Sequence, residues 1–467
     1  MSCVQIDKIH SGLSIVNSSL NISSGWLGSE LTVGTYGQVC VMNGGYVENS
    51  LINAAGAIIL SSGAGAEMTQ VSSGGGLHVY SGAIASRTTV NQGGYFGVGD
   101  GAKTYETTIA ESGSLTVWNG GVVASNTIQN AGAIILSSGA VANVTDITPG
   151  GALHVFSGAT ASNTNVQQSG FFGVGDGATT YDTTIDVGGA LTVWGGGVVN
   201  RNTIQDSGAI TLSSGAAADS STIMSGGALH VFAGAVASNT VVKQGGFFGV
   251  GYGAETFKTT VDVSGVLTVW GGGVVHENQI NQWGAIILSS GAVANSTTIT
   301  PDGGLHIFEG ATAFTTKITS GAFLGIGGGG SLYNADLENT ASMAFYDGSI
   351  LRGWIDAEGS IITSGTVDAA QTFLNFELGD RTASQGAILD NMQNLTAVQR
   401  YSVEVDTDQA AGIYALAGGA DNFAGSLALY VGDGNDCGTL SVGTCLDYAG
   451  KQYCLQTNGG ILALSIS

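Results

Sequence analysis

Apolar residues recur along most of the chain with a fixed 19-residue spacing. When Gly44 is taken as position 1 of a unit, position 9 is Ile, Val or Leu in every unit, and positions 15 and 17 are also apolar. In the first unit these residues are Ile52, Ile58 and Leu60. The alternation at positions 15 and 17 has the period of a β-strand, because successive side chains of a strand point to opposite faces. Each unit therefore predicts short strands separated by turns.

Glycine marks the same repeat. Every nineteenth residue from Gly44 to Gly329 is a Gly, which makes sixteen units, and position 13 is Gly in all units except those with Ala322 and Ala341. We expect glycine at positions 1 and 13 to supply the backbone freedom of tight corners. One such unit cannot bury its apolar residues alone, so successive coils must stack in register. The predicted fold is all-β: a single-stranded right-handed parallel β-helix, or β-solenoid, of about sixteen regular 19-residue coils, plus a small β-rich C-terminal module.

Four consecutive units form a longer 76-residue repeat, which we call a cassette. The segment G-[GA]-L-H-[VI]-[FY] occurs once in each cassette and places a His at 78, 154, 230 and 306. The repeat predicts four regions: an irregular N-terminal cap over 1–43, the regular solenoid over 44–347, irregular final coils over 348–370, and the β-rich module over 371–467. Segments beginning at Tyr401, Gly412, Tyr453 and Asn458 alternate like hairpin strands.

Position 7 is polar in most units and shares its parity with the inward position 9. It is Ser50, Thr69 and Thr88 in the first three units. We interpret it as an internal polar ladder that satisfies backbone groups at a corner. The alternative is an ice-binding array of threonines, which would need two outward Thr columns, and position 8 is interrupted by residues such as Leu51 and Gln70.

Composition excludes several classes of partner. The chain of 467 residues is 43% hydrophobic and only 10% charged, which is enough apolar surface to fold. Eleven Lys and Arg against 34 Asp and Glu give a net charge of −23, so nucleic acids and anionic membrane surfaces are poor partners. No run of 18 apolar residues occurs, so we expect no membrane insertion by this chain. Of five cysteines, Cys437, Cys445 and Cys454 lie close enough in sequence for a local disulfide.

The outward positions 14, 16 and 18 carry a pattern that folding alone does not explain. In each cassette, one unit carries a His and an aromatic residue at these positions, the next unit carries two glycines, and the unit after that carries another aromatic residue. This order predicts a bare strip of backbone between two aromatic walls. We predict ligand-binding notches there, for sugar rings or for another copy of the chain. The alternative is that the position 14 aromatic folds over its own glycine and fills the notch. The predicted residues are His78, Tyr80, Tyr95, Gly97, Gly99, Trp118, His154, Phe156, Phe171, Gly173, Gly175, Trp194, His230, Phe232, Phe247, Gly249, Gly251, Trp270, His306, Phe308, Phe323, Gly325, Gly327 and Tyr346.

Neither a metal centre nor a catalytic centre is indicated. The repeated histidines lie four coils apart, roughly 19 Å at the β spacing, so they cannot share one metal ion. We expect no cofactor. Catalysis needs a singular constellation, and no spacing picks out an acid and a base among the carboxylates near the end of the repeat. Those carboxylates are Asp336, Glu338, Asp347, Asp356 and Glu358.

Units such as GAVASNTVVKQGGFFGVGY (234–252) and GAVANSTTITPDGGLHIFE (291–309) resemble the 19-residue AIDA repeats of self-associating autotransporter adhesins of Gram-negative bacteria. The resemblance covers about 44–347. It implies a bacterial surface or secreted protein that acts in adhesion, self-association or biofilm formation, with Ser/Thr glycosylation. No signal peptide is visible in Met1–Gly12, so we expect export elements to lie outside this chain or the route to differ.

The leading hypothesis is therefore a non-enzymatic adhesin-like solenoid at the outer surface or outside the cell, whose partners are surface glycans or another copy of itself. One alternative is a polysaccharide lyase or hydrolase, because many parallel β-helices are enzymes, although a fold alone does not confer a function. Another is a passive stalk or spacer.

Overall fold

The computed structural model describes residues 8–467 except residues 73, 81, 138, 157, 214, 233 and 433. Cys3 and the start of the segment considered for a signal peptide lie outside the described residues. The chain divides into two compact units, Met1–Ala237 and Ser238–Ser467. Among the described residues the only helix is the 3-10 turn η1 (Met392–Asn394), and no helix there is long and apolar enough to cross a membrane.

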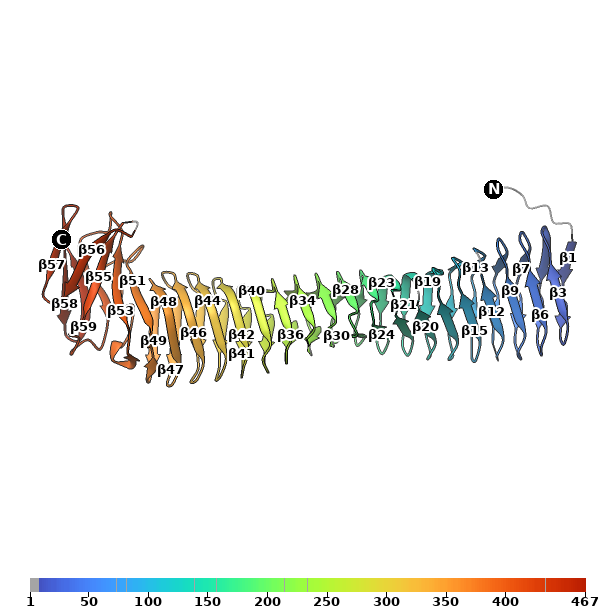
Figure 1. Ribbon diagram of the computed structural model, residues 1–467, viewed down its shortest axis with the longest axis horizontal. Coiled ribbons are helices and arrows are strands. Elements are labelled where there is room, and N and C mark those ends of the chain that lie inside the picture. The colour runs from blue at the N-terminus through green and yellow to red at the C-terminus, as the bar shows by residue number, and fades with distance from the viewer. Residues whose placement is uncertain are drawn as a thin grey trace. The chain divides into compact units, whose positions relative to one another are not determined.

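Within each unit, a coil of the repeat contains three short strands, or two where the first and second merge as in β19 (Val122–Ile128), and these pair with the equivalent strands of the next coil. In the coil that begins at Gly44 these are β7 (Tyr46–Glu48), β8 (Leu51–Ile52) and β9 (Ala57–Leu60), and in the next coil β10 (Gly65–Glu67), β11 (Gln70–Val71) and β12 (Gly76–Val79). All three pairs are parallel and in register at the 19-residue step, as in Ile58 opposite Leu77. Figure 1 shows equivalent strands of successive coils, such as β6, β9 and β12, following one another along the stack. The predicted β-solenoid is confirmed.

The interior of each coil is filled by the residues of positions 9, 15 and 17. Ile52, Ile58 and Leu60 are fully buried, and so are their counterparts in later coils. Position 7 is also inward, since Ser50 and Thr69 are buried, which confirms an internal ladder and excludes an outward Thr array at this position. Ser50 Oγ donates to the carbonyl oxygen of Glu48 at 3.0 Å, whereas the Thr69 hydroxyl is buried with no hydrogen-bond partner. The polar ladder therefore forms hydrogen bonds with the backbone at only some of the corners.

The corners differ from the prediction in their use of glycine. Positions 1, 6 and 12 have a left-handed backbone in every coil, as in Gly44 (φ +73°), Asn49 (φ +50°) and Ala55 (φ +63°), and some coils add a neighbouring residue such as Ala54 (φ +44°). Position 6 is left-handed in all sixteen units although it is never glycine. Position 13 is glycine for another reason: a Cβ at Gly75 would lie 2.6 Å from the carbonyl oxygen of Ile52 in the preceding coil. Close backbone approach, not a left-handed turn, favours glycine at that position, which Ala322 and Ala341 occupy in the last two units.

Parallel stacking begins before residue 44. Near the start of the described chain, β1 (Lys8–Ser11) pairs with β4 (Trp26–Ser29), and β3 (Ser19–Ile22) pairs with β6 (Gln38–Val41). The first pair, with Lys8 opposite Trp26, has a step one residue shorter than that of the regular repeat, whereas the second, with Ser19 opposite Gln38, already has the regular step. The boundary predicted at residue 43 remains a prediction.

At the other end, in the second unit, parallel pairing continues along a series of longer strands. These are β44 (Thr312–Ile318), β46 (Ser331–Leu337), β48 (Ile350–Ala357), β51 (Thr372–Glu377), β53 (Arg400–Val405) and β55 (Ser426–Val431). The segment at Tyr401 was expected to be a hairpin strand, and that expectation is wrong, because β53 pairs in parallel with both β51 and β55. The parallel edge of β51 offers backbone partners that extend the stack.

Among the described strands, antiparallel pairing occurs at the C-terminal end, from β54 and β55 onward, apart from one isolated bridge between Ala370 and Val398. A four-stranded sheet has the order β54 (Gly412–Ala417), β59 (Ile461–Ile466), β58 (Lys451–Asn458), β57 (Cys445–Tyr448), and β56 (Asp436–Ser441) pairs antiparallel with β55. Cys445 and Cys454 form a disulfide between β57 and β58, while Cys40 and Cys437 are free thiols. The small β-rich C-terminal module is thus present, with one disulfide inside it.

Candidate functional site

The predicted site residues of the first cassette form a compact aromatic cluster on three neighbouring strands. They lie on or beside β12, β15 (Tyr95–Val98) and β18 (Ser114–Val117). The imidazole of His78 stacks on Tyr80 with ring centroids 6.1 Å apart and planes 4° apart, and it contacts the Tyr95 ring at 5.6 Å. Tyr80 meets Trp118 edge-on at 6.2 Å. The side chains come together because parallel register places every outward position beside its counterpart in the next coil.

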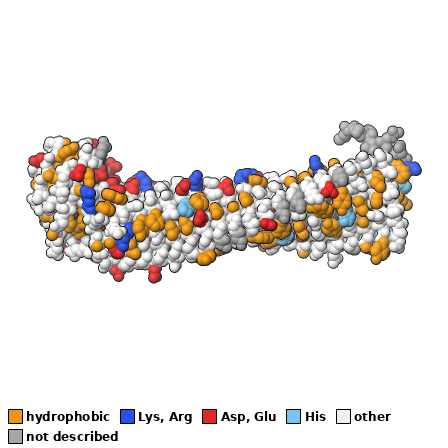
Figure 2. All heavy atoms as spheres, viewed as in Figure 1, with side chains coloured by type: hydrophobic (Ala, Val, Ile, Leu, Met, Phe, Trp, Pro, Cys, Tyr) orange, Lys and Arg blue, Asp and Glu red, His pale blue; other side chains and the backbone are white. Residues whose placement is uncertain are grey.

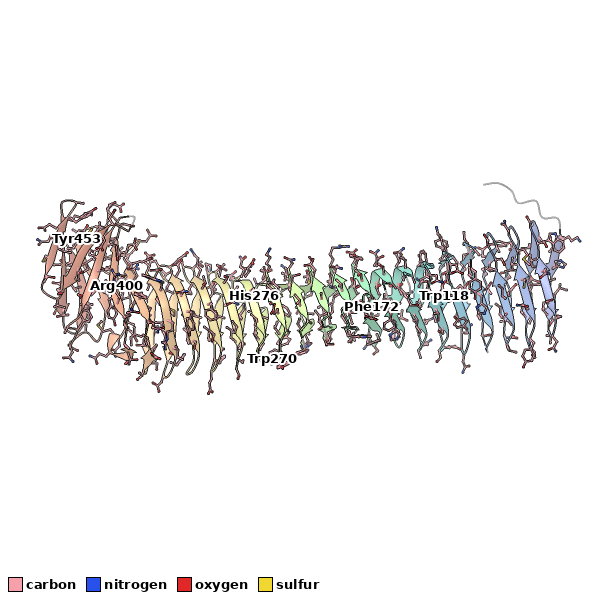
Figure 3. All side chains as sticks on the ribbon, viewed as in Figure 1. Trp118, Phe172, Trp270, His276, Arg400 and Tyr453 are labelled. Atoms are coloured by element: carbon pink, nitrogen blue, oxygen red, sulfur yellow. A yellow bond between two sulfur atoms is a disulfide. The ribbon has the colours of Figure 1, made fainter. Side chains whose placement is uncertain are left out.

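The glycine strip in this cassette is covered, so the bare notch predicted from the sequence is wrong here. A Cβ at Gly97 would lie 2.9 Å from Cη2 of Trp118 and 3.2 Å from Cε1 of Tyr95, and a Cβ at Gly99 only 2.6 Å from Nε1 of Trp118. Both glycines are buried beneath these rings. The alternative of a filled notch therefore describes the geometry, with Trp118 of the next coil supplying most of the cover. Figure 3 labels the place of Trp118 along the coils.

The second cassette repeats this arrangement. His154 stacks on Phe156 at 6.0 Å and contacts Phe171 at 5.5 Å, and Phe156 meets Trp194 at 6.2 Å. The strands are β22 (Ala152–Val155), β24 (Phe171–Val174) and β27 (Ala190–Val193). Trp194 covers the glycines here as well, since a Cβ at Gly175 would lie 2.7 Å from its Nε1. The site is therefore a preformed aromatic surface.

The residues of the third cassette are divided between the two compact units. His230 stacks on Phe232 at 6.0 Å with planes 6° apart, as in the first two cassettes. Phe247 and Gly249 belong to β36 (Phe247–Val250), Trp270 follows β39 (Val266–Val269), and Gly249 lies in register with Thr268. Gly251 is buried, like its counterparts Gly99 and Gly175.

In the fourth cassette only one of the two glycines, Gly327, is left uncovered, whereas Gly325 lies under the ring of Phe323, the position 14 aromatic of its own coil. His306 stacks on Phe308 at 6.5 Å, and Phe323 covers Gly325 at 3.1 Å. Tyr346, which replaces the tryptophan, is 53% exposed, and a Cβ at Gly327 would meet nothing closer than the carbonyl oxygen of Ile307 at 3.4 Å. The strands are β43 (Gly304–Ile307), β45 (Phe323–Ile326) and β47 (Ser342–Tyr346). Tryptophan is thus what closes the notch in the first two cassettes.

The clusters are uncharged at neutral pH. Burial lowers the pKa of the histidine in every cassette, because desolvation disfavours the imidazolium form. No group of three or more His, Cys, Asp or Glu side chains that could hold a metal ion occurs in the part of the chain that the structure describes. The clusters offer flat aromatic and imidazole faces, which suit stacking on sugar rings or on other aromatic groups.

The substitution Gly99→Ala tests whether the indole of Trp118 lies over the glycines. The added methyl group would overlap the indole of Trp118, so we expect the ring to be displaced and the free energy of unfolding to fall by about 1–2 kcal/mol. Tryptophan fluorescence and chemical denaturation measure both effects. Gly327→Ala is the matched control, because its methyl group has room and should change neither quantity; equal effects of the two substitutions would contradict this packing.

A second candidate surface lies over the final coils, where the sequence analysis considered carboxylates. Glu338 accepts hydrogen bonds from Lys317 and the backbone of Ser320, and Asp347 accepts one from the backbone of Thr366 at 2.8 Å. Glu358 accepts from the backbone N–H groups of residues 339 and 380, at 3.2 and 2.6 Å. These three carboxylates therefore hold turns of the backbone.

The remaining two carboxylates, Asp336 on β46 and Asp356 on β48, are in register on adjacent strands and face outward. Burial raises the pKa of Asp356, and a hydrogen bond from Asn375 opposes that shift. The aromatic neighbours of Asp356, namely Trp354 and Phe373, were not predicted from the sequence; their rings stack at 4.6 Å with planes 16° apart. The available signal was the break in the repeat: position 9 of the unit starting at Gly348 falls on Asp356 instead of an apolar residue.

Comparison with protein-family models gives no match, and comparison with curated protein sequences gives none. Among solved structures, the chain is similar to one described as the crystal structure of the TibC-catalyzed hyper-glycosylated TibA55-350 fragment. The two are 23% identical, the match covers 70% of this chain and 100% of that chain, and the TM-score is 0.44.

Proposed function

We propose that this chain is a non-enzymatic, adhesin-like β-solenoid of a bacterial surface or secreted protein, and that its repeated outward face mediates self-association or adhesion. The observation that carries the proposal is the recurrence of the aromatic cluster with the 76-residue period of the cassettes, with the same ring contacts in the first two of them. The resemblance of the units to AIDA repeats is the reason for the expected surface location, and it also suggests Ser/Thr glycosylation.

Repetition of the aromatic cluster along the chain strengthens binding by this surface. A single cluster exposes a few half-buried rings, which is too little area for a stable interface. Near-identical clusters on stacked coils bind as a set, because once one is engaged the others act at a high effective concentration. Another copy of the chain carries the same spacing and would match cluster to cluster.

The test is a variant in which Trp118, Trp194 and Trp270 are all replaced by Ala. We expect self-association, followed by sedimentation velocity across a concentration series, to weaken at least tenfold, since large apolar side chains dominate such interfaces. Circular dichroism should show that the solenoid persists, because the buried positions 9, 15 and 17 are unchanged.

Trp283→Ala is the matched control. Trp283 is 61% exposed, but it lies at a left-handed corner (φ +59°) and not in a cluster. Its replacement should leave association unaltered. Unchanged association of the triple variant would overturn the proposal. It would favour the passive spacer, for which removing one whole cassette alters reach but not binding.

A further inference from the structure

The parallel stack of the second unit is interrupted at one strand by an extra residue. Between β46 and β48 the register shifts after Tyr333, so that Asn334 faces both Gly353 and Trp354. Asn334 Oδ1 accepts a hydrogen bond from the Trp354 backbone N–H at 2.9 Å, and Gly353 has a left-handed backbone (φ +76°). Such bulges redirect a side chain and are common beside binding sites. Here the bulge projects Trp354 outward, 56% exposed.

Trp354 lies between two hollows that adjoin along the coils. One, of about 390 Å³, is lined by residues such as Thr298, Lys317 and Asp336, and the other, of about 210 Å³, by residues such as Asn375 and Tyr430. Trp354 and Asp356 line both hollows. Phe373 stacks on Trp354, so the indole is held as a fixed platform between the two hollows, which together we call the groove.

The floor of the second hollow is a connected polar network. Asn375, which is 7% exposed, donates from Nδ2 to Asp356 Oδ1 at 3.2 Å and to Glu404 Oε2 at 3.3 Å, and its Oδ1 accepts from the Ser402 hydroxyl at 2.9 Å. These contacts fix the side chains in place and leave each carboxylate with a second oxygen. Rigid carboxylate, amide and hydroxyl groups beside an aromatic face are a polar set suited to sugar hydroxyls.

The negative charge of the groove disfavours anionic ligands. Acidic side chains gather over the coils around β51 and β53 (Figure 2), and Asp336, Asp356 and Glu404 line the groove. An anionic glycan would meet these carboxylates at close range, which costs several kcal/mol. Lys317 pairs with Asp336 and Glu338, and Arg400, which donates to the Tyr430 hydroxyl at 2.6 Å, lines the second hollow beside two carboxylates, Asp356 and Glu404.

We propose that this groove is a binding site for an uncharged oligosaccharide, with one pyranose ring stacked on Trp354 and hydroxyl groups hydrogen-bonded to Asp356, Asn375 and Glu404. The two hollows on either side of Trp354 accommodate the neighbouring sugar units. The site is separate from the aromatic clusters of the cassettes and shares no residue with them. It therefore stands whether or not those clusters mediate self-association.

Isothermal titration calorimetry of the full chain with neutral oligosaccharides of glucose, galactose and N-acetylglucosamine tests the proposal. We expect saturable binding of at least one of them, and Trp354→Ala should weaken it at least tenfold, whereas Trp354→Phe should retain part of the affinity. Trp283→Ala is the control for an exposed tryptophan elsewhere and should bind as the parent does. Asp356→Asn should weaken binding and leave the aromatic platform in place, which near-ultraviolet circular dichroism checks.

Absence of saturable binding by every neutral oligosaccharide would overturn the proposal, and so would equal binding by Trp354→Ala. Binding confined to oligogalacturonate or to glucosamine oligomers would also overturn it, because it would make the groove a site for charged ligands. The sedimentation behaviour of Trp354→Ala should match that of the parent chain. A failure of glycan binding is thus distinguishable from a failure of self-association.

Discussion

Replacing Phe172 with Ala should lower the free energy of unfolding by about 3–5 kcal/mol, the usual cost of removing a fully buried aromatic side chain. Phe172 is fully buried inside its coil (Figure 3), where it lies in register between Leu153 and Leu191 of the neighbouring coils. Each coil of a solenoid is stabilised chiefly by its two neighbours, so the cavity weakens both interfaces at once. Urea unfolding followed by far-ultraviolet circular dichroism measures the loss.

Phe171→Ala is the matched control on the same strand. Phe171 points outward and is half-buried against His154, so its removal should cost only about 1 kcal/mol. The two substitutions remove the same side chain from adjacent positions on opposite faces. Equal losses of stability would contradict the inward and outward assignment of the whole repeat, because every coil uses the same alternation.

Replacing Glu377 with Gln should stabilise the protein at alkaline pH and have little effect at acid pH. Burial, together with repulsion from Asp356, Asp336, Glu404 and Glu358, raises the pKa of Glu377 from 4.5 to about 7. The folded state therefore holds a proton that the unfolded state releases, and stability falls as pH rises from about 4.5 to about 7. Because the carboxylate is partly solvated, we expect about 1–2 kcal/mol from this group.

Thermal unfolding at pH 4.5 and pH 8 measures this effect. The Tm of Glu377→Gln should match that of the parent at pH 4.5 and exceed it by about 1–2 °C at pH 8. Glu309→Gln is the control, because Glu309 is an exposed carboxylate outside the acidic group and its replacement should act alike at both pH values. A lower Tm of Glu377→Gln at pH 8 would show that the ionised carboxylate stabilises the fold.

The repeat in the sequence predicts most of the fold because each coil is a local unit with the same environment. Ile58 and Leu77 alternate with outward residues in the way a half-buried strand requires, and the 19-residue step dictates which residues become neighbours. The corners were harder to predict. Position 6 has a left-handed backbone with residues as different as Asn49 and Val144, so the type of residue there does not predict this conformation. The stacking of neighbouring coils imposes it.

At the candidate sites, the 19-residue alignment predicts which residues are neighbours but not how their side chains lie. The sequence placed His78 and Tyr80 on one side of the glycines and Trp118 on the other, because parallel register is enough to do so, but in the structure the rings of Tyr80 and Trp118 meet. Whether Trp118 stands beside the glycines or lies on them depends on its rotamer, which register does not determine. Trp354 was not predicted because it belongs to a strand with an extra residue. The extra residue shifts the register, so the 19-residue alignment no longer shows which residues of neighbouring coils lie side by side.

The constant 19-residue step also governs which changes of length the gene can tolerate. Loss or duplication of a whole coding repeat would join strands that already face compatible neighbours, so recombination between repeats can shorten or lengthen the protein without disturbing its core. A single codon gained inside a strand would turn every later inward residue of that strand outward. The extra residue at Gly353 shows what tolerance of such a change requires: a left-handed glycine and an asparagine that holds the displaced backbone.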